Sequence, residues 1–326
     1  MSARSLKVTL TRRLPDAVET RMRELFDATL NLTDRPLSRD QLAAAMATCD
    51  VLVPTITDRI DADLIAGAGE RLKLIANFGA GTEHIDVAAA QARGIVVTNT
   101  PGVLTEDTAD LAMTLILAVS RRVVEGAAAL QDGRFEGWTP TWMCGRKLWG
   151  KRLGIVGMGR IGQALARRAR AFGMQVHYHN RKAVSPLVEE ELAATYWDDL
   201  DAMLPRMDVI SLNCPATPET HHILSADRLS RLQPHTVVIN TARGELIDEA
   251  ALAAALADRR LGGVGLDVFE HEPAVHPGLL NRPDAVLLPH LGSATVESRQ
   301  DMGDRVILNV MTFGTGHRCP DRVLPL

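Results

Sequence analysis

The sequence is poor in several features that would place a protein in a special class. Aromatic residues make up only 4% of the 326 residues, so a core has to be built from aliphatic side chains. Neither a run of about 20 apolar residues nor an apolar leader at the start is present, so we expect no membrane span and no secretion signal. The formal net charge is −4 without a block of like charge, which argues against a nucleic-acid or membrane-surface partner.

Cysteines are also few and lack an informative arrangement. The four of them are scattered through the chain without the spacing of a metal site or a disulfide framework. They are Cys49, Cys144, Cys214 and Cys319. These features together predict a cytoplasmic protein with reduced thiols.

What the sequence does contain is a regular alternation of short apolar runs and longer amphipathic runs, which is typical of parallel α/β sheets. The first series of expected strands covers 7–11, 50–55, 72–78 and 95–99. The second series covers 152–158, 175–180, 208–213, 236–241, 263–268 and 285–290. The clearest helices are expected at 15–26, 38–49, 84–94, 105–122, 160–172 and 295–313, with two arginines closing the helix over 105–122. The fold class predicted is therefore α/β, with two doubly wound parallel-sheet domains.

The order of the motifs predicts how the chain is divided. A glycine-rich turn lies in the second series, and one more helix follows the last strand. We therefore expect residues 1–103 and 291–326 to form a substrate domain around an inserted dinucleotide-binding domain, 104–290. Ligands of such sheets bind outside the carboxyl ends of the strands, so a cleft there is the expected site.

The glycine-rich turn is Gly157-Met-Gly159-Arg-Ile-Gly162. Such a motif alone is a weak signal, but here an apolar run precedes it and an amphipathic run follows it. Glycines at these places permit a tight turn, close approach of a pyrophosphate and tight packing of helix on strand. The following helix offers N–H groups and partial positive charge to the phosphates.

A second motif departs from the usual dinucleotide pattern. An acidic residue about 20 positions after the turn normally binds the adenosine ribose, but Asn180, Arg181 and Lys182 stand there. A guanidinium group can bind a phosphate with two hydrogen bonds, so the segment favours a 2′-phosphorylated ribose and hence NADP(H). The alternative is a solvated basic loop without a ligand.

Three later strand ends carry ionisable groups. Arg243 follows one expected strand, Asp267 and Glu272 follow the next, and His290 follows the last. Any one of these would most simply be a surface ion pair or a structural histidine. Three successive strands that deliver such groups to one edge of a sheet indicate a catalytic site.

The motifs GMGRIG, NTARGELID, GLDVFEHEP and PHLGSAT resemble those of the D-isomer-specific 2-hydroxyacid dehydrogenases. Their order and spacing agree over nearly the whole chain, and NFGAGTEHID (77–86) resembles the family's substrate loop. Within the family the sequence is most similar to the glyoxylate/hydroxypyruvate reductase branch. The resemblance implies a Rossmann coenzyme domain inserted into a flavodoxin-like substrate domain, and a homodimer.

The resemblance also implies roles for individual residues. Arg243 would bind the carboxylate and the carbonyl of a 2-keto acid, His290 would exchange a proton with the carbonyl oxygen, and Glu272 would hold the imidazole. Asp267 would orient the nicotinamide carboxamide. The substrate carboxylate would also meet the backbone of Gly79, Ala80 and Gly81. Cofactor contacts are expected from Gly157, Gly159, Arg160, Ile161, Gly162, Asn180, Arg181, Lys182, Cys214, Pro215, Thr220, Thr241, Ala242, Arg243, Asp267, His290 and Gly292.

Other features of the sequence give weaker indications of function. The histidines His177, His179, His221 and His222 lack a third ligand at suitable spacing, so no metal site is expected. Cys214 is more simply a small apolar residue than a reactive thiol. The Trp-rich segment 137–149 resembles the family's dimer arm, in which Trp142 would reach the partner's substrate pocket, but core packing explains that residue equally well. The size of the pocket is expected to depend on Leu52, Phe78 and Trp142.

The function predicted is the reduction of glyoxylate and hydroxypyruvate by NADPH, with NADH as a second coenzyme. Alternatives are a broad 2-keto acid reductase, an NAD-linked D-lactate or D-glycerate dehydrogenase, and a non-catalytic nucleotide-sensing co-regulator. The sequence leaves open which 2-keto acid is preferred, in which direction the reaction runs, and how strictly NADPH is selected.

Overall fold

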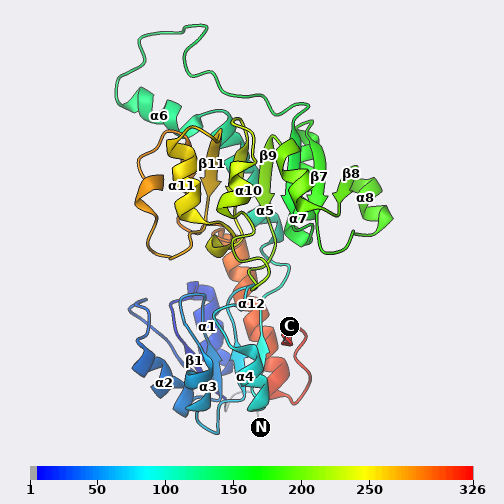
Figure 1. The fold of residues 1–326 in the computed structure, drawn as a ribbon. Coiled ribbons are helices and arrows are strands. Elements are labelled where there is room, and N and C mark those ends of the chain that lie inside the picture. Colours follow the sequence, from blue (N-terminus) through cyan, green and yellow to red (C-terminus); the bar gives the residue numbers. More distant parts are fainter. Residues whose placement is uncertain (1–5, 326) are drawn as a thin grey trace. The chain divides into compact units, whose positions relative to one another are not determined.

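The computed structural model describes residues 6–325, and the chain divides into two compact units (Figure 1). Unit 1 consists of Met1–Leu104 and Ala294–Leu326, and unit 2 consists of Thr105–Ser293. The sequence placed residue 104 in the dinucleotide-binding domain and 291–293 in the substrate domain, whereas Leu104 lies in unit 1 and Leu291–Ser293 lie in unit 2. Within residues 6–325 no helix is long and apolar enough to cross a bilayer.

Unit 1 is built on a five-stranded parallel sheet in the order β2-β1-β3-β4-β5, which is the flavodoxin-like doubly wound order. Its strands are β1 (Lys7–Leu10), β2 (Asp27–Thr29), β3 (Val51–Val53), β4 (Leu74–Ala76) and β5 (Val96–Thr98). Its helices are α1 (Asp16–Leu25), α2 (Arg39–Thr48), α3 (Ala62–Ala66), α4 (Val87–Ala92) and α12 (Val296–Gly314).

The strands of unit 1 bury side chains on both faces of the sheet. Val51 and Val53 pack with residues of α1 and α12 on one face, while Leu52, between them, packs with residues of α2 and α3 on the other. The last helix of the chain therefore completes the core of the first segment. It begins at the N-cap Thr295, whose hydroxyl accepts a hydrogen bond from Ser298 N.

Unit 2 contains a seven-stranded parallel sheet in the order β12-β11-β10-β9-β6-β7-β8. Counted from β6, this is the Rossmann order with one further strand at the β11 edge. The strands are β6 (Arg152–Val156), β7 (Gln175–His179), β8 (Ala194–Trp197), β9 (Val209–Leu212), β10 (Val237–Asn240), β11 (Gly263–Leu266) and β12 (Ala285–Leu287).

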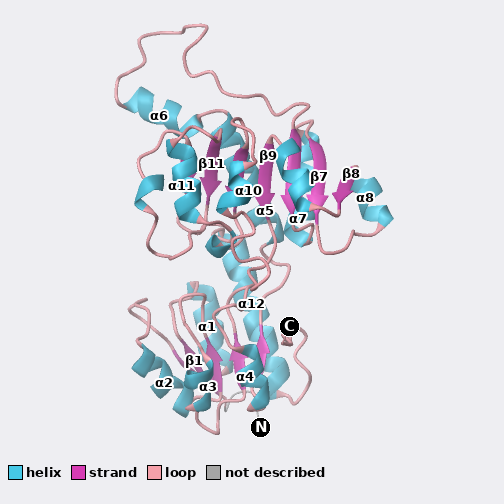
Figure 2. Cartoon of the chain, viewed as in Figure 1, coloured by secondary structure: helices cyan, strands magenta, loops and turns pink. Residues whose placement is uncertain are grey.

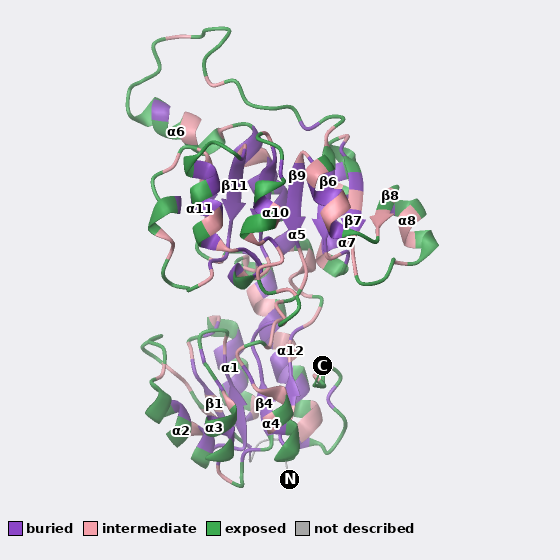
Figure 3. Cartoon of the chain, viewed as in Figure 1, coloured by how far each residue is buried: buried purple, intermediate pink, exposed green. Residues whose placement is uncertain are grey.

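Helices cover both faces of this sheet (Figure 2). Residues of α5 (Thr105–Ser120) and α7 (Arg160–Ala171) share one core cluster with the strands, and residues of α9 (Leu200–Met203), α10 (Ala226–Ser230) and α11 (Glu249–Ala257) share the other. The strands at 209–212, 237–240 and 263–266 are buried throughout (Figure 3). The remaining elements are α6 (Val123–Gln131), α8 (Pro186–Leu192) and the short 3-10 helices η2 (Leu204–Arg206), η3 (Gly244–Leu246) and η4 (Pro277–Leu279).

The prediction of four and six strands was wrong at the edges of both sheets. The strands β2 and β8 pair with β1 and β7, although neither is a buried apolar run. The expected helix over 105–122 ends at Ser120, so Arg121 and Arg122 lie beyond its last turn, and α6 follows at once. The helix α3 was missed because its five residues are too few to show a helical period.

Candidate active site

The glycine-rich turn connects β6 to α7, and its three glycines meet different surroundings. Gly157 has φ +102°, and a Cβ there would lie 2.5 Å from Cys214 N. At Gly162 a Cβ would overlap the carbonyl oxygen of Gly157, so helix and turn pack backbone to backbone. At Gly159, the N-cap of α7, a Cβ would meet nothing within 4 Å. The turn is thus tightly built on the protein side and open at the helix start, which fits a pyrophosphate.

The segment after β7 divides into a structural and an exposed part. Asn180 Oδ1 accepts a hydrogen bond of 2.7 Å from Met158 N, so this side chain holds the glycine-rich turn. The side chains of Arg181 and Lys182 are exposed, and within residues 6–325 they make no hydrogen bond or ion pair. The exposed carboxyl group of Glu219, which sequence reasoning missed, has a lowered pKa because of hydrogen bonds from Thr217 and its own backbone and because of the Arg181 charge.

The ends of β9 and β10 carry most of the other expected cofactor residues. Thr220 Oγ1 donates to Pro215 O at 2.8 Å and closes the turn after β9. Burial raises the pKa of the Cys214 thiol to about 11, which agrees with an unreactive side chain. Thr241 Oγ1 and Asn213 Oδ1 are buried without a partner within the described part of the chain. Asn213 was not among the expected residues, yet such unsatisfied atoms at this edge fit a bound polar ligand.

Arg243 follows β10 and Ala242, where the chain is shaped by its own side chains. Asn240 Nδ2 donates to Arg243 O at 2.7 Å, and Asn240 Oδ1 accepts from Ala242 N at 3.0 Å. The next residue, Gly244, lies so close to the backbone of Phe269 that a Cβ would overlap the Phe269 carbonyl group. The loop that carries Arg243 is therefore packed directly on the loop that carries Glu272.

His290 and Glu272 form a hydrogen-bonded pair. His290 Nδ1 lies 2.9 Å from Glu272 Oε2 and 3.2 Å from Oε1. Burial raises the pKa of the Glu272 carboxyl, but the hydrogen bond and charge of His290, the N–H of Phe269 and the charge of Arg243 outweigh this, and the pKa is lowered. His290 has φ +58°, an uncommon conformation for a non-glycine residue that the surrounding contacts must maintain.

Asp267 holds the segment that carries His290. Its Oδ1 and Oδ2 accept hydrogen bonds from Leu291 N at 2.6 Å and Gly292 N at 2.8 Å, and its carbonyl oxygen accepts from His290 N at 2.8 Å. Burial nevertheless keeps the pKa of the carboxyl above its ordinary value. This support of the His290 loop adds to the predicted contact with the nicotinamide.

The substrate loop of unit 1 has a definite polarity. Asn77 Nδ2 donates to Gly79 O at 3.1 Å and to Gly81 O at 2.8 Å, and Asn99 Nδ2 donates to Ala80 O at 2.7 Å. The N–H groups of Gly79, Ala80 and Gly81 have no protein partner within residues 6–325. Because the carbonyl oxygens of the loop are occupied by these hydrogen bonds, its N–H groups are the atoms available to a ligand. A row of N–H donors suits an anion.

Two of the side chains expected to set the pocket size are buried in the core of unit 1. Leu52 is 0% exposed in the core under α2 and α3, and Phe78 is 5% exposed in the opposite core. Trp142 is 40% exposed and stacks on Phe135 with 5.8 Å between ring centroids, so packing in the core of this chain does not explain it.

The expectation that the histidine pair lacks a third ligand was wrong. Glu270 lies beside His221 and His222, and the donor atoms of the three lie within 4.8 Å of one another. The two rings stack at 4.0 Å with an interplanar angle of 26°. Nearly parallel rings point their nitrogen lone pairs side by side and not toward one point, so this arrangement suits an ion pair better than a metal ion. His177 and His179 both contact Trp197 instead.

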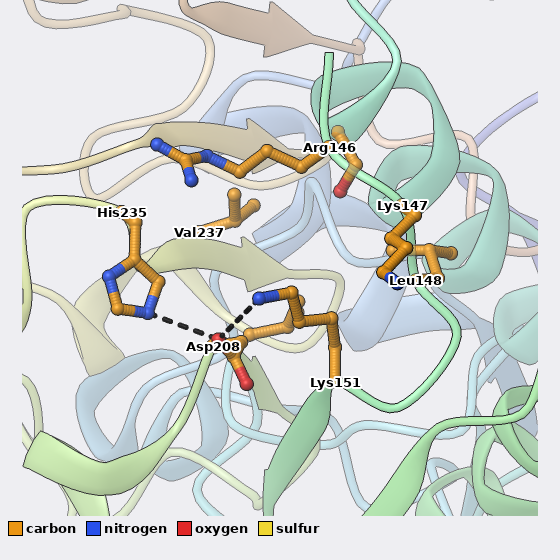
Figure 4. Close-up of a pocket in the computed structure, with 9 residues that line it drawn as sticks. Arg146, Lys147, Leu148, Lys151, Asp208, His235 and Val237 are labelled. Atoms are coloured by element: carbon orange, nitrogen blue, oxygen red, sulfur yellow. Dashed lines mark hydrogen bonds and ion pairs between the residues drawn. The ribbon is translucent and has the colours of Figure 1, made fainter.

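A hollow at the opposite edge of the unit 2 sheet is separate from these residues. It lies at the amino ends of β6, β9 and β10, where Asp208 Oδ1 contacts His235 Nε2 at 3.0 Å and Lys151 Nζ at 3.4 Å (Figure 4). Ligands of parallel sheets bind at the carboxyl ends of the strands, so the candidate active site is the edge with the glycine-rich turn.

Comparison with known proteins decides the family. Residues 113–292 match the model of the D-isomer specific 2-hydroxyacid dehydrogenase, NAD binding domain. A glyoxylate reductase of Thermococcus litoralis is 42% identical over 321 residues, which cover 97% of this chain and 96% of the relative. The chain belongs to this family.

Other members extend the comparison. A glycerate dehydrogenase of Hyphomicrobium methylovorum is 38% identical over 296 residues, covering 91% of this chain and 92% of the relative. The crystal structure of an NADPH-dependent glyoxylate/hydroxypyruvate reductase from Sinorhizobium meliloti, in complex with NADP and malonate, matches with a TM-score of 0.87 and 36% identity, covering 98% of this chain and 96% of that one. The protein is thus an NAD(P)-dependent dehydrogenase of the glyoxylate reductase branch, and the sequence-based expectations of family and fold class are confirmed.

Proposed function

We propose that this dehydrogenase reduces small 2-keto acids, with glyoxylate and hydroxypyruvate as the leading candidates, to D-2-hydroxy acids at the expense of NADPH. The observation that carries the proposal is the His290–Glu272 pair beside the loop of Arg243. A protonated imidazole, held by a carboxylate, next to a guanidinium group is a suitable set for a substrate that has a carbonyl beside a carboxylate. The names of the relatives support the choice of glyoxylate.

Each of the three residues has a distinct part in this reaction. Arg243 binds the substrate carboxylate and polarises the carbonyl. When bound, the reduced nicotinamide supplies a hydride to the carbonyl carbon. His290 donates its proton to the carbonyl oxygen as negative charge develops there, and takes it back in the reverse direction. Because Nδ1 is engaged by Glu272, we assign this transfer to Nε2.

The loop 79–81 of unit 1 is proposed to bind a carboxylate group. The N–H groups of Gly79, Ala80 and Gly81 are the donors, because they have no protein partner within residues 6–325. Asp267 supports the reaction by holding the His290 segment and by orienting the nicotinamide carboxamide. The remaining cofactor contacts are those of the glycine-rich turn and the strand ends described above.

Selection of NADPH rests on Arg181 and Lys182. Two exposed cations that make no hydrogen bond or ion pair within residues 6–325, next to the ribose end of the expected nucleotide site, can bind a 2′-phosphate. Glu219 supports the alternative of an NAD-linked D-glycerate or D-lactate dehydrogenase. Its negative charge interacts with Arg181, and so it competes with a 2′-phosphate for that side chain.

A panel of keto acids assayed with NADPH and NADH tests the proposal. We expect the highest kcat/KM for glyoxylate or hydroxypyruvate with NADPH. Arg181→Asp should raise the KM for NADPH by about tenfold or more while leaving NADH little changed. The exposed Arg35→Asp is the matched control. A wild-type enzyme with equal rates for both coenzymes would contradict the assignment of Arg181.

The catalytic assignment has its own test. His290→Ala should reduce kcat by at least about a thousandfold while the dissociation constant for NADPH stays close to that of the wild type. Nucleotide binding is followed by fluorescence, and turnover by absorbance. Retained turnover in this variant would remove His290 from the proton transfer.

We further propose that the protein is a homodimer. The segment 132–150 extends from unit 2 as a long loop (Figure 1), and it carries Trp138 at 83% and Trp149 at 73% exposure. Large exposed apolar side chains of this kind commonly mark an interface. Light scattering that shows a monomer at micromolar concentration would overturn the proposal.

A further inference from the structure

A second histidine–carboxylate pair lies next to the catalytic one. His222 Nε2 is 2.7 Å from Glu270 Oε1, and the two residues are separated by 48 positions in the chain. Their side chains are 29% and 18% exposed. Glu270 stands two residues before Glu272, so this pair is joined by a single turn to the pair that contains His290.

The backbone around His222 is attached to the segment that follows Arg243. His222 N donates to Glu245 O at 2.8 Å, and Leu224 N donates to Leu246 O at 3.0 Å. His222 itself has φ +49°, a conformation that costs a non-glycine residue about 1 kcal/mol or more. The loop therefore holds His222 in a strained position from which its ring reaches Glu270.

The first two N–H groups of the turn 269–272 each donate a hydrogen bond to a carboxylate. Phe269 N donates to Glu272 Oε1 at 3.1 Å, and Glu270 N donates to Glu249 Oε1 at 2.7 Å. Glu249 is the first residue of α11 and is 6% exposed. With Glu249 fixing the backbone and His222 fixing the side chain of Glu270, the turn has little freedom to change the direction of Glu272.

We propose that His222 is a positioning residue for the reaction: through Glu270 it holds the turn that carries Glu272, and so it maintains the contact between Glu272 and His290. The inference rests on the proposed role of the His290–Glu272 pair. One loop thus connects the segment behind Arg243 with the segment before Glu272. His222 needs no contact with substrate or cofactor for this role.

The pH dependence of turnover reports the position of Glu272. The charges of His290 and Arg243 lower the pKa of this carboxyl. The Glu272 carboxylate in turn repels the negative charge of Asp267 and raises the pKa of that group. If the turn loosens, the contact with His290 weakens and the pKa of Glu272 returns toward its ordinary value. The ion pair is then lost at a higher pH, so the acid limb of kcat/KM moves upward.

The test compares His222→Ala with His222→Gln in the full-length protein. His222→Ala should lower kcat by about tenfold or more, since small displacements of catalytic groups are costly, and should shift the acid limb toward higher pH. The dissociation constant for NADPH should stay within about twofold of the wild type, because the residue does not bind the nucleotide. His222→Gln keeps an N–H donor for Glu270 and should restore most of kcat.

Two controls separate this role from others. His221→Ala removes the stacked neighbour but not the contact with Glu270, and should behave like the wild type. Glu270→Ala should reproduce His222→Ala, and the double variant should lose no more than either single one. If His222→Ala does not fold, Glu270→Ala and Glu270→Gln decide in the same way.

The outcomes that overturn the proposal are equally definite. An unchanged kcat and acid limb in both His222→Ala and Glu270→Ala would remove the positioning role while leaving the proposed function intact. Equal losses in His221→Ala and His222→Ala that a chelator reproduces in the wild type would assign the cluster to a metal ion. A wild-type protein without turnover on any keto acid would instead overturn the proposed function itself.

Discussion

Gly244 and Phe269 meet backbone to backbone, and a Cβ on Gly244 would overlap the Phe269 carbonyl group. The contact joins two loops at neighbouring strand ends, one after β10 and one after β11. Arg243 precedes Gly244, and Glu272 follows Phe269 by three residues. The distance between a proposed substrate-binding residue and a proposed proton-transfer pair is therefore set by two backbones in van der Waals contact.

Gly244→Ala should consequently damage both stability and turnover. The new methyl group faces backbone on a buried side, so one loop must move, and we expect a loss of about 3 kcal/mol in the free energy of unfolding. In the folded fraction kcat should fall further, because Arg243 and Glu272 separate. Urea denaturation and kinetics measure the two effects. Gly126→Ala is the control, because a Cβ in that helix meets nothing within 4 Å and should stabilise by about 0.5 kcal/mol.

Gly159→Ala should have the opposite profile from Gly244→Ala. The position is open and has an ordinary φ of −78°, so the variant should unfold at the same temperature as the wild type. The methyl group would stand where the pyrophosphate approaches α7, and the affinity for NADPH should fall by about tenfold or more. Gly157→Ala, with φ +102° and Cys214 N close by, should instead destabilise the fold. Normal NADPH binding by Gly159→Ala would contradict the placement of the cofactor.

Asn77→Asp tests the substrate loop. The substitution replaces two donated hydrogen bonds, to Gly79 O and Gly81 O, by repulsion between a carboxylate and two carbonyl groups. Asn77 is 0% exposed, so we expect a loss of about 2 kcal/mol in stability. The negative charge also opposes a substrate carboxylate, so KM for the keto acid should rise by about tenfold while KM for NADPH changes little. Asn281→Asp, at an exposed position, should leave both constants unchanged.

Features that depend on local pattern could be predicted from the sequence. Buried parallel strands are continuous apolar runs, and the residue after each run lies at the carboxyl edge, so Arg243, Glu272 and His290 could be assigned to one edge. The glycine-rich turn could be assigned because its neighbours in sequence form the strand and the helix. The edge strands β2 and β8 could not, because they bury little and carry no apolar run.

Features that depend on the direction of a side chain, or on a partner far away in the chain, could not be predicted from the sequence. Leu52 lies between Val51 and Val53 in one apolar run, and only the sheet decides which face receives which residue. Glu270 meets His222 because parallel strand order brings their loops together across 48 positions. A carboxylate two residues before Glu272 has no pattern of its own, so spacing alone did not reveal this partner.

At the amino edge of the unit 2 sheet, Asp208 contacts a backbone N–H group and two basic side chains. Its Oδ2 accepts from Arg152 N at 2.8 Å, and its Oδ1 contacts Lys151 and His235 (Figure 4). The side chain is 13% exposed. Burial raises the pKa of this carboxyl, but the hydrogen bond from Arg152 N and the charges of Lys151 and His235 outweigh it, and the pKa is lowered.

Asp208→Asn should therefore lower the free energy of unfolding at neutral pH. The variant should also lose less of that free energy than the wild type when the pH falls. Because the folded state holds this proton more weakly than the unfolded chain, whose pKa is about 3.9, the carboxylate stabilises the fold above that pH. The contribution disappears as the pH falls through the lower pKa of the folded state. We expect a deficit of about 1–2 kcal/mol at pH 7 that shrinks below about pH 4, measured by urea denaturation across pH. Asp304→Asn, in the exposed pair with Arg21, should cost less than about 0.5 kcal/mol. An Asp208→Asn deficit that stays constant from pH 7 to pH 3 would show that packing, and not charge, is the source of the loss.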